Sequence, residues 1–298
     1  MNYKPLGKSN LHISEISFGC MSLGDDHQEN SNLLHRALDN GINYFDTADI
    51  YQKGFNEVTV GKALANRRDK VIIATKVGNV WRPDGSGLDW NPTKAHILKS
   101  ADESLQRLQT DYIDLYQLHG GTINDPIDET IEALEQLKEK GKIRYYGISS
   151  IRPNVIREYV RRSNIVSVMM QYSLLDRRPE ETCMNLLHEH NIGLLTRGSL
   201  ASGLLINKPA KPYLNYSEQE VIEATRVIKK VADGKRLNSE VALRFVLNHP
   251  SVISAVVGMH TFDQLDESLR VVKSPSLSPE EYRLLQHAIK INTYADHR

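Results

Sequence analysis

The chain has few cysteines, no excess of either charge and no long hydrophobic run. Its 298 residues include two cysteines, too few for a disulfide scaffold or a cysteine metal cluster. Lysine plus arginine and aspartate plus glutamate both total 37, so no charge excess favours nucleic acid or an anionic membrane as partner. No window approaches the roughly 18 to 20 apolar residues of a membrane span, and the N-terminal MNYKPLGKSNLHIS lacks a secretory apolar run. We therefore expect a soluble cytoplasmic protein that acts on small molecules.

Two common enzyme motifs are also missing. No G-x-G-x-x-G sequence follows the first predicted strand, which argues against an open dinucleotide-binding sheet. No His-x-His follows that strand, and the histidines show no metal-ligand spacing, which argues against a metal hydrolase.

Short β-branched apolar runs alternate with amphipathic stretches along the whole chain, the pattern of parallel strands joined by helices. Strands are predicted at residues 15–19, 43–46, 71–76, 113–119, 145–149, 168–172, 192–196 and 254–258. Helices are predicted around 33–38, 58–65, 95–108, 130–140, 155–162, 182–190, 218–232 and 262–271. Eight such repeats, without a linker or internal repeat, favour an α/β fold in one domain spanning 1–298, a (β/α)8 TIM barrel.

Three segments are additions to this barrel. The leading YKPLGKSNLHIS has a Gly-Lys-Ser-Asn turn between short extended runs, which predicts an N-terminal β-hairpin able to close the bottom of the barrel. Two additional helices are predicted at 239–248 and 279–292, the second opened by the start signal Ser-Pro-Glu-Glu at 278–281.

Polar residues end the predicted strands, where active sites of such barrels lie. The second, third and fourth strands end on Asp46, Lys76 and His119, the fifth on Ser149 and Ser150, and the sixth on Gln171 and Tyr172. Buried polar groups need partners, so we expect Lys76 to pair with Asp46. Tyr51, in the loop after Asp46, would bring its hydroxyl over this pair, where an ammonium stabilises the phenolate.

Each of these residues has an ordinary structural alternative when taken alone. Asp46 is also suited to cap a helix, and Lys76 or His119 to a structural ion pair or hydrogen bond. Stability alone, however, favours apolar residues at strand ends, so four complementary groups on three consecutive strands point to a reactive site.

These residues lie in motifs that resemble the aldo-keto reductase family over essentially the full length. The motifs are FDTADIY (45–51), N-E-x-x-x-G-K-A-L (56–64), T-K (75–76), LYQLH (115–119), KEKGKIRYYGIS (138–149) and QYSLLDR (171–177). The resemblance implies the catalytic residues Asp46, Tyr51, Lys76 and His119, no metal, and NADPH extended across the barrel mouth. It also implies reduction of a small carbonyl substrate to an alcohol, with Tyr51 as general acid.

The same resemblance implies the residues that bind the cofactor. It places Ser149 and Gln171 against the nicotinamide carboxamide and Asp46 near the ribose. An aromatic ring of the family is replaced by Arg197, which we expect to contact the cofactor in preference to the substrate. A loop rich in small residues is expected at the pyrophosphate and comprises Gly198, Ser199, Leu200, Ser202 and Gly203. The stretch that resembles the family's adenosine-binding segment contributes Gly258, His260, Gln264, Glu267 and Ser268.

The choice between NADPH and NADH depends on His260. This histidine lies two residues after Gly258, at a position where the family commonly has an arginine or a lysine. A protonated His260 still suits a 2′-phosphate, so NADPH is expected and NADH is the second choice.

Substrate identity, flux direction and oligomeric state stay open at this stage. The loop GNVWRPDGSGLDWNP holds Trp81 and Trp90, which either pin the loop to the barrel or line a pocket for small aromatic or aliphatic aldehydes. A cofactor-binding regulatory or redox-sensing subunit is one alternative function. A Schiff-base lyase using Lys76 is another, which an adjacent Asp46 disfavours by keeping the amine charged.

Overall fold

Eight parallel strands form a closed barrel in the computed structural model, which describes residues 1–298. In sequence order they are β3 (Ile16–Gly19), β4 (Tyr44–Asp46), β5 (Ile72–Val77), β8 (Ile113–Leu118), β9 (Ile143–Ser149), β10 (Ser167–Gln171), β11 (Gly193–Arg197) and β12 (Val252–Gly258). Each pairs with its neighbour in sequence order, and β12 closes on β3. The predicted TIM barrel is confirmed.

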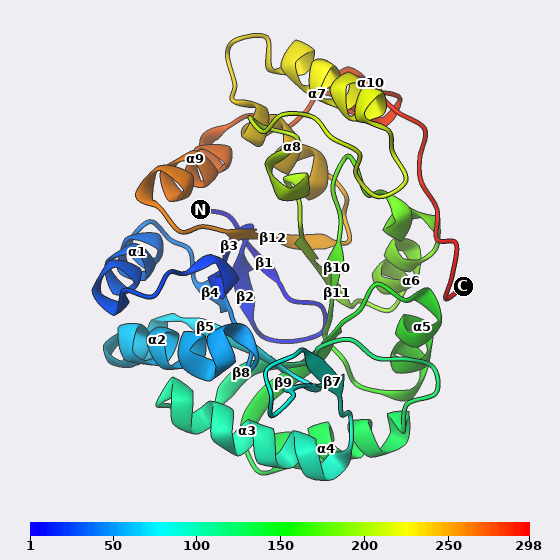
Figure 1. Cartoon of the computed structure of the whole chain (residues 1–298). Coiled ribbons are helices and arrows are strands. Elements are labelled where there is room, and N and C mark those ends of the chain that lie inside the picture. Colours follow the sequence, from blue (N-terminus) through cyan, green and yellow to red (C-terminus); the bar gives the residue numbers. More distant parts are fainter.

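Helices surround the barrel, as Figure 1 shows. They are α1 (His27–Asp39), α2 (Phe55–Leu64), α3 (Lys94–Leu108), α4 (Ile127–Glu139), α5 (Pro153–Arg162), α6 (Cys183–Glu189), α7 (Glu218–Ala232) and α9 (Phe262–Lys273), with the two additional helices α8 (Asn238–Leu247) and α10 (Pro279–Gln286). None of these helices combines the length and apolar character that a membrane crossing requires.

Helix α10 begins as predicted but ends six residues earlier than the predicted 292. Its start is a capping box, in which the Ser278 and Glu281 side chains bond each other's backbone N–H. After Gln286 the chain leaves the helix to bury Tyr294 and to place the Asn292 amide oxygen 2.9 Å from the backbone nitrogen of Arg177. These tertiary contacts outweigh the helical preference of the sequence.

The N-terminal hairpin closes one end of the barrel, as predicted. Strands β1 (Tyr3–Pro5) and β2 (His12–Ser14) pair antiparallel. Buried Leu6, Leu11 and Ile13 from this hairpin pack against side chains inside the barrel, namely Tyr44, Ala74, Leu115, Val166, Met169, Leu195 and Val256. The barrel interior is therefore a filled apolar core below the strand ends.

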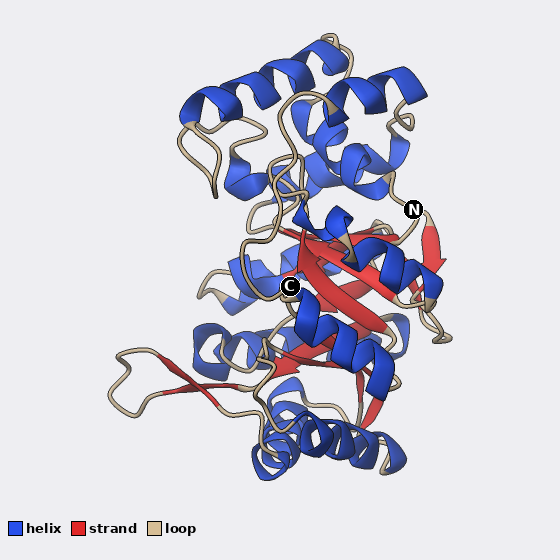
Figure 2. Ribbon diagram, turned by 90° about the vertical axis from the view of Figure 1, so that its right-hand side faces the viewer, coloured by secondary structure: helices blue, strands red, loops and turns tan.

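A second hairpin was not predicted. Strands β6 (Asn79–Trp81) and β7 (Leu88–Trp90) pair antiparallel within the segment expected to be a loop. Figure 2 shows this hairpin extending away from the barrel, on the side opposite the N-terminus. Its strands of three residues are half-buried or exposed, so they lack the apolar alternation that would identify them in the sequence.

Candidate active site

The period-two geometry of the strands builds the polar mouth of the barrel. Successive side chains of a strand point to opposite faces, so a residue two positions past an inward-facing one also faces inward. Tyr44, Ala74, Leu115, Met169, Leu195 and Val256 form the inner apolar layer. Two positions further stand Asp46, Lys76, Gln117, Gln171, Arg197 and Gly258. The apolar layer thus gives way to a polar one at the C-terminal strand ends.

A pocket of about 560 Å³ opens at this mouth. All four predicted catalytic residues line it, as do seven of the predicted cofactor contacts: Asp46, Ser149, Gln171, Arg197, Gly198, Ser202 and Gly258. Ser199, Leu200, Gly203, His260, Gln264, Glu267 and Ser268 lie outside its lining.

Lys76 and Asp46 form a buried ion pair on the adjacent strands β5 and β4. The Lys76 ammonium also donates to the Thr47 carbonyl oxygen at 2.7 Å. Burial acts to lower the pKa of Lys76, but the Asp46 carboxylate and the Tyr51 hydroxyl outweigh it, so this pKa is raised. Burial raises the pKa of Asp46, and Lys76 opposes that rise. The predicted pairing is present, and Lys76 stays charged.

Gln117 is a contact that the sequence reasoning missed. Its side-chain nitrogen donates to the second oxygen of Asp46 at 3.2 Å, while its own carbonyl oxygen is buried without a partner. Leaving such an oxygen unpaired is unfavourable, so we interpret Gln117 as holding the Asp46 carboxylate toward Lys76. The signal was available, because Gln117 lies two residues after the inward-facing Leu115 and therefore on the same face of β8.

Tyr51 lies directly above this pair. Its hydroxyl is 3.4 Å from the Lys76 nitrogen, and its ring centroid is 5.0 Å from that nitrogen. The turn that carries it is fixed by the next residue, Gln52, which has a left-handed φ of 48° and donates to the Leu23 carbonyl oxygen at 3.3 Å. These contacts hold the phenol over the ammonium before any ligand arrives.

His119 faces Tyr51 across the pocket. The two rings lie edge to face, with centroids 6.0 Å apart and an interplanar angle of 82°. Burial, with smaller contributions from Lys76 and Arg197, lowers the pKa of His119 to about 3. The imidazole is therefore neutral at physiological pH. Its Nδ1 atom is buried without a protein partner, so Nε2 is the ring nitrogen left to face the pocket.

Both tryptophans of the 78–92 segment pin it to the barrel. The Trp90 indole donates to Asp125 at 3.0 Å, and its ring packs against Gly78 and Gly120. The Trp81 indole donates to the Ile50 carbonyl oxygen at 3.0 Å, next to Tyr51. Neither residue lines the pocket. Of the two alternatives the structure supports the one in which they anchor the hairpin.

Arg197 belongs to a small hydrogen-bonded group at the pocket wall. Its guanidinium donates to the side-chain oxygen of Gln171 at 3.1 Å, and the Gln171 nitrogen donates to the Tyr213 hydroxyl at 3.0 Å. Tyr213 also lines the pocket, and the sequence reasoning missed it. It lies in an irregular segment between β11 and α7, where no periodicity indicates which residues return to the site.

Comparison with known proteins identifies the family. The sequence matches the model of the aldo/keto reductase family over residues 15–290, so the chain belongs to this family and is an oxidoreductase. Enzymes of this family typically use NAD(P)H and act on small substrates.

The chain is similar to several known proteins over all or nearly all of its length. The aldo-keto reductase AKR11C1 from Bacillus halodurans, in its holo form, is 50% identical over 100% of this chain and 99% of that chain, with a TM-score of 0.94. The uncharacterized oxidoreductase YqkF from Bacillus subtilis strain 168 is 49% identical, with 100% of both chains covered. A probable voltage-gated potassium channel subunit beta from Arabidopsis thaliana is 31% identical over 94% of each chain.

Asp49, between Asp46 and Tyr51, yields a prediction about stability. Burial, and then the nearby Glu57 carboxylate, raises its pKa to about 8, and one of its oxygens has no hydrogen-bond partner. Between pH 4 and 8 the folded chain therefore holds a proton that the unfolded chain releases. Because the folded state binds this proton more tightly, the free energy of unfolding falls as pH rises through that window.

The variant Asp49→Asn removes this titration. Its free energy of unfolding, measured with urea from pH 5 to 8, is expected to increase steadily relative to that of the wild type as pH rises. The exposed-site control Asp111→Asn is expected to show a constant difference. A constant difference for Asp49→Asn as well would contradict this assignment.

Proposed function

We propose that the chain reduces aldehydes and ketones to alcohols with NADPH, and that Tyr51 is the general acid. The observation that carries the proposal is the buried Lys76–Asp46 pair beneath the Tyr51 hydroxyl, in a pocket that also presents a neutral imidazole. The family of the chain and its similarity to the holo form of AKR11C1 support the same reaction class.

Tyr51 donates its hydroxyl proton to the carbonyl oxygen of the substrate. The Lys76 ammonium, 3.4 Å from that hydroxyl, stabilises the phenolate left behind, and Asp46 keeps the ammonium in place. The low dielectric constant of the buried site strengthens both interactions. General acid catalysis of this kind is worth about 10²- to 10⁴-fold in rate.

His119 orients the substrate and does not act as an imidazolium acid. Its pKa of about 3 leaves it neutral at the pH of the cell, and Nε2, the ring nitrogen that is not buried, provides a hydrogen-bonding position in the pocket. A neutral imidazole can hold the carbonyl oxygen near Tyr51 without competing for the proton. The edge-to-face contact with the Tyr51 ring fixes the relative orientation of the two groups.

The residues around the pocket fit a nicotinamide cofactor, which supplies the hydride when bound. Ser149 and Gln171 present a hydroxyl and an amide, as the nicotinamide carboxamide requires, and Arg197 offers a guanidinium plane at the same wall. Gly258 lines the pocket beside Ser22, whose hydroxyl oxygen would lie 2.5 Å from a Cβ at this position, so any larger residue would require Ser22 to move. The left-handed φ of Gly198, 65°, fits a loop that turns its backbone toward phosphate.

The adenosine end of the cofactor is proposed to lie at the start of α9. Thr261 caps this helix and precedes Gln264, whose side-chain oxygen accepts from the His260 backbone nitrogen at 3.0 Å. This arrangement orders His260 for a 2′-phosphate, together with the positive end of the helix dipole. Ser199, Leu200, Gly203, Glu267 and Ser268 complete the proposed set of contacts.

One other function is favoured by a specific observation. The similarity to a probable potassium channel subunit beta supports a regulatory or redox-sensing subunit that binds the cofactor while docked on a partner. Steady-state oxidation of NADPH with a panel of aldehydes distinguishes the two functions, since only the enzyme turns over. A Schiff-base lyase is disfavoured, because the raised pKa of Lys76 keeps its amine protonated.

The variant Tyr51→Phe tests the general acid. We expect kcat for aldehyde reduction to fall about 10²- to 10⁴-fold, because the hydroxyl is lost while the ring remains. NADPH affinity, measured by fluorescence titration, is expected to stay within about twofold, and the control Tyr3→Phe to retain full activity. Near-normal reduction by Tyr51→Phe would refute the assignment.

The preference for NADPH makes a second prediction. We expect a lower Michaelis constant for NADPH than for NADH at equal aldehyde concentration, because only NADPH carries the 2′-phosphate that His260 would bind. The variant His260→Leu is expected to reduce this preference without changing the constant for NADH. A lower constant for NADH in the wild type would overturn the choice of cofactor.

A further inference from the structure

A second pocket, of about 450 Å³, lies at the opposite end of the barrel. It is formed by the turn of the N-terminal hairpin and by the first residues of β5, β8 and β9. Its volume is in the range of small-molecule sites. Strands β4, β5 and β8 begin beside this pocket and end at the mouth of the barrel. The full length of these strands therefore separates the second pocket from the candidate active site.

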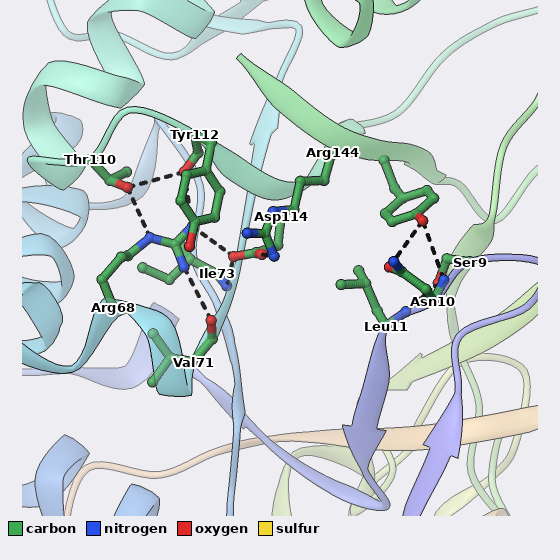
Figure 3. Close-up of polar contacts among 11 residues, drawn as sticks. Ser9, Asn10, Leu11, Arg68, Val71, Ile73, Thr110, Tyr112, Asp114 and Arg144 are labelled. Atoms are coloured by element: carbon green, nitrogen blue, oxygen red, sulfur yellow. Dashed lines mark hydrogen bonds and ion pairs between the residues drawn. The ribbon is translucent and has the colours of Figure 1, made fainter. Parts of the chain in front are cut away.

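One wall of this pocket belongs to a stack of three side chains, drawn in Figure 3, of which Tyr112 and Arg144 line the pocket and Arg68 does not. The Tyr112 ring lies between the guanidinium groups of Arg68 and Arg144, whose central carbons are 4.0 and 4.1 Å from the ring centroid. Cation–π contact and packing hold both planes in place. The buried Asp114 carboxylate joins the stack by accepting from both arginines, at 2.7 and 3.1 Å.

The two arginines differ in how many of their donors are used. Arg68 donates to Thr110, Val71, Tyr112 and Asp114 at 2.7 to 3.1 Å, so its guanidinium is satisfied by the protein. Arg144 makes one such bond, to Asp114, and its side chain is 50% exposed. Because the two arginines share the single negative charge of Asp114, one positive charge is left over, and the free N–H groups of Arg144 present it at the pocket.

Besides Arg144, two side chains of the pocket, Lys70 and Asn10, have donors that no protein group accepts, whereas both ends of the Asn43 amide are used. Lys70 lines the pocket and forms no ion pair with the protein. The Asn10 side-chain oxygen accepts from Tyr145 at 3.0 Å, which leaves its NH₂ group free. The exposed Asp69 carboxylate is the opposing acceptor, and Leu11 and Val71 supply apolar wall. The unused hydrogen-bonding capacity therefore calls for a ligand with acceptor oxygens.

We propose that this pocket binds a small metabolite through an oxyanion group, a phosphate or a carboxylate, held between Arg144 and Lys70. Tyr112 fixes the Arg144 plane in advance, so little side-chain entropy is lost on binding, and a fixed guanidinium suits the paired oxygens of either group. Leu11 and Val71 contact the body of the ligand. The site does not depend on the proposed reductase activity.

Isothermal titration calorimetry tests the proposal on the full chain at constant ionic strength, first without NADP⁺ and then with NADP⁺ saturating the proposed cofactor site. Ribose 5-phosphate and succinate are the phosphate and carboxylate probes, and ribose is the neutral control. We expect at least one probe to bind with one site per chain, ribose not to bind, and the probe that binds to identify the oxyanion.

Variants locate the binding. Arg144→Gln removes the charge while Arg68 still pairs with Asp114, and Lys70→Met alters a side chain with no ion pair to lose. Each is expected to weaken binding at least about tenfold, the value of one charge-assisted hydrogen bond. The matched control Arg161→Gln, at a side chain 71% exposed, is expected to bind as wild type does.

Three results would overturn the site. Binding of neither probe would make the arginine–tyrosine stack a purely structural element. Unchanged affinity in both Arg144→Gln and Lys70→Met would place the oxyanion elsewhere. Loss of probe binding on addition of NADP⁺ would assign it to the catalytic mouth.

Discussion

The buried ion pair between Lys76 and Asp46 is the interaction on which the rest of the site depends. Removing an ammonium and a carboxylate from water is costly, and the attraction between them offsets that cost only when both are held in good geometry. Here the adjacent strands β4 and β5 hold them, and Thr47 and Gln117 satisfy a further donor and acceptor. A rigid barrel is therefore a requirement of the proposed chemistry.

The apolar layers below Lys76 and Asp46 explain why this ion pair is buried. The N-terminal hairpin inserts Leu6, Leu11 and Ile13 into one end of the barrel, and a layer of apolar side chains lies above them. Lys76 lines the pocket at the mouth together with Tyr51 and His119, and its side chain is 1% exposed. The ammonium can thus act on the Tyr51 hydroxyl in surroundings of low dielectric constant.

The barrel was predictable because its strands are buried on both faces and separated by long amphipathic helices. The ion pair was predictable because Asp46 and Lys76 end neighbouring strands, and polar groups there need partners. The β6–β7 hairpin was not, because its short exposed strands carry no periodic pattern.

Other features depend on contacts between distant parts of the chain. Tyr213 contacts Gln171 from an irregular segment 42 residues later in the sequence. The chain after α10 leaves the helix, and its Asn292 accepts a hydrogen bond from the backbone of Arg177. The low pKa of His119 follows from burial together with Lys76 and Arg197, which a linear sequence does not reveal. The orientations of Trp81 and Trp90 likewise follow from hydrogen bonds to Ile50 and Asp125, which lie far away in the sequence.

A double-mutant cycle on Asp46→Asn and Lys76→Met tests the central claim most directly, with the free energy of unfolding and kcat measured for both single variants and the double variant. Each single change should lose about 3 to 5 kcal/mol of stability by leaving a buried charge unpaired, and the double variant should lose much less than the sum. For kcat, the second change should add little to the first, because the pair acts on Tyr51 as a unit. Additive losses in both measurements would contradict the account.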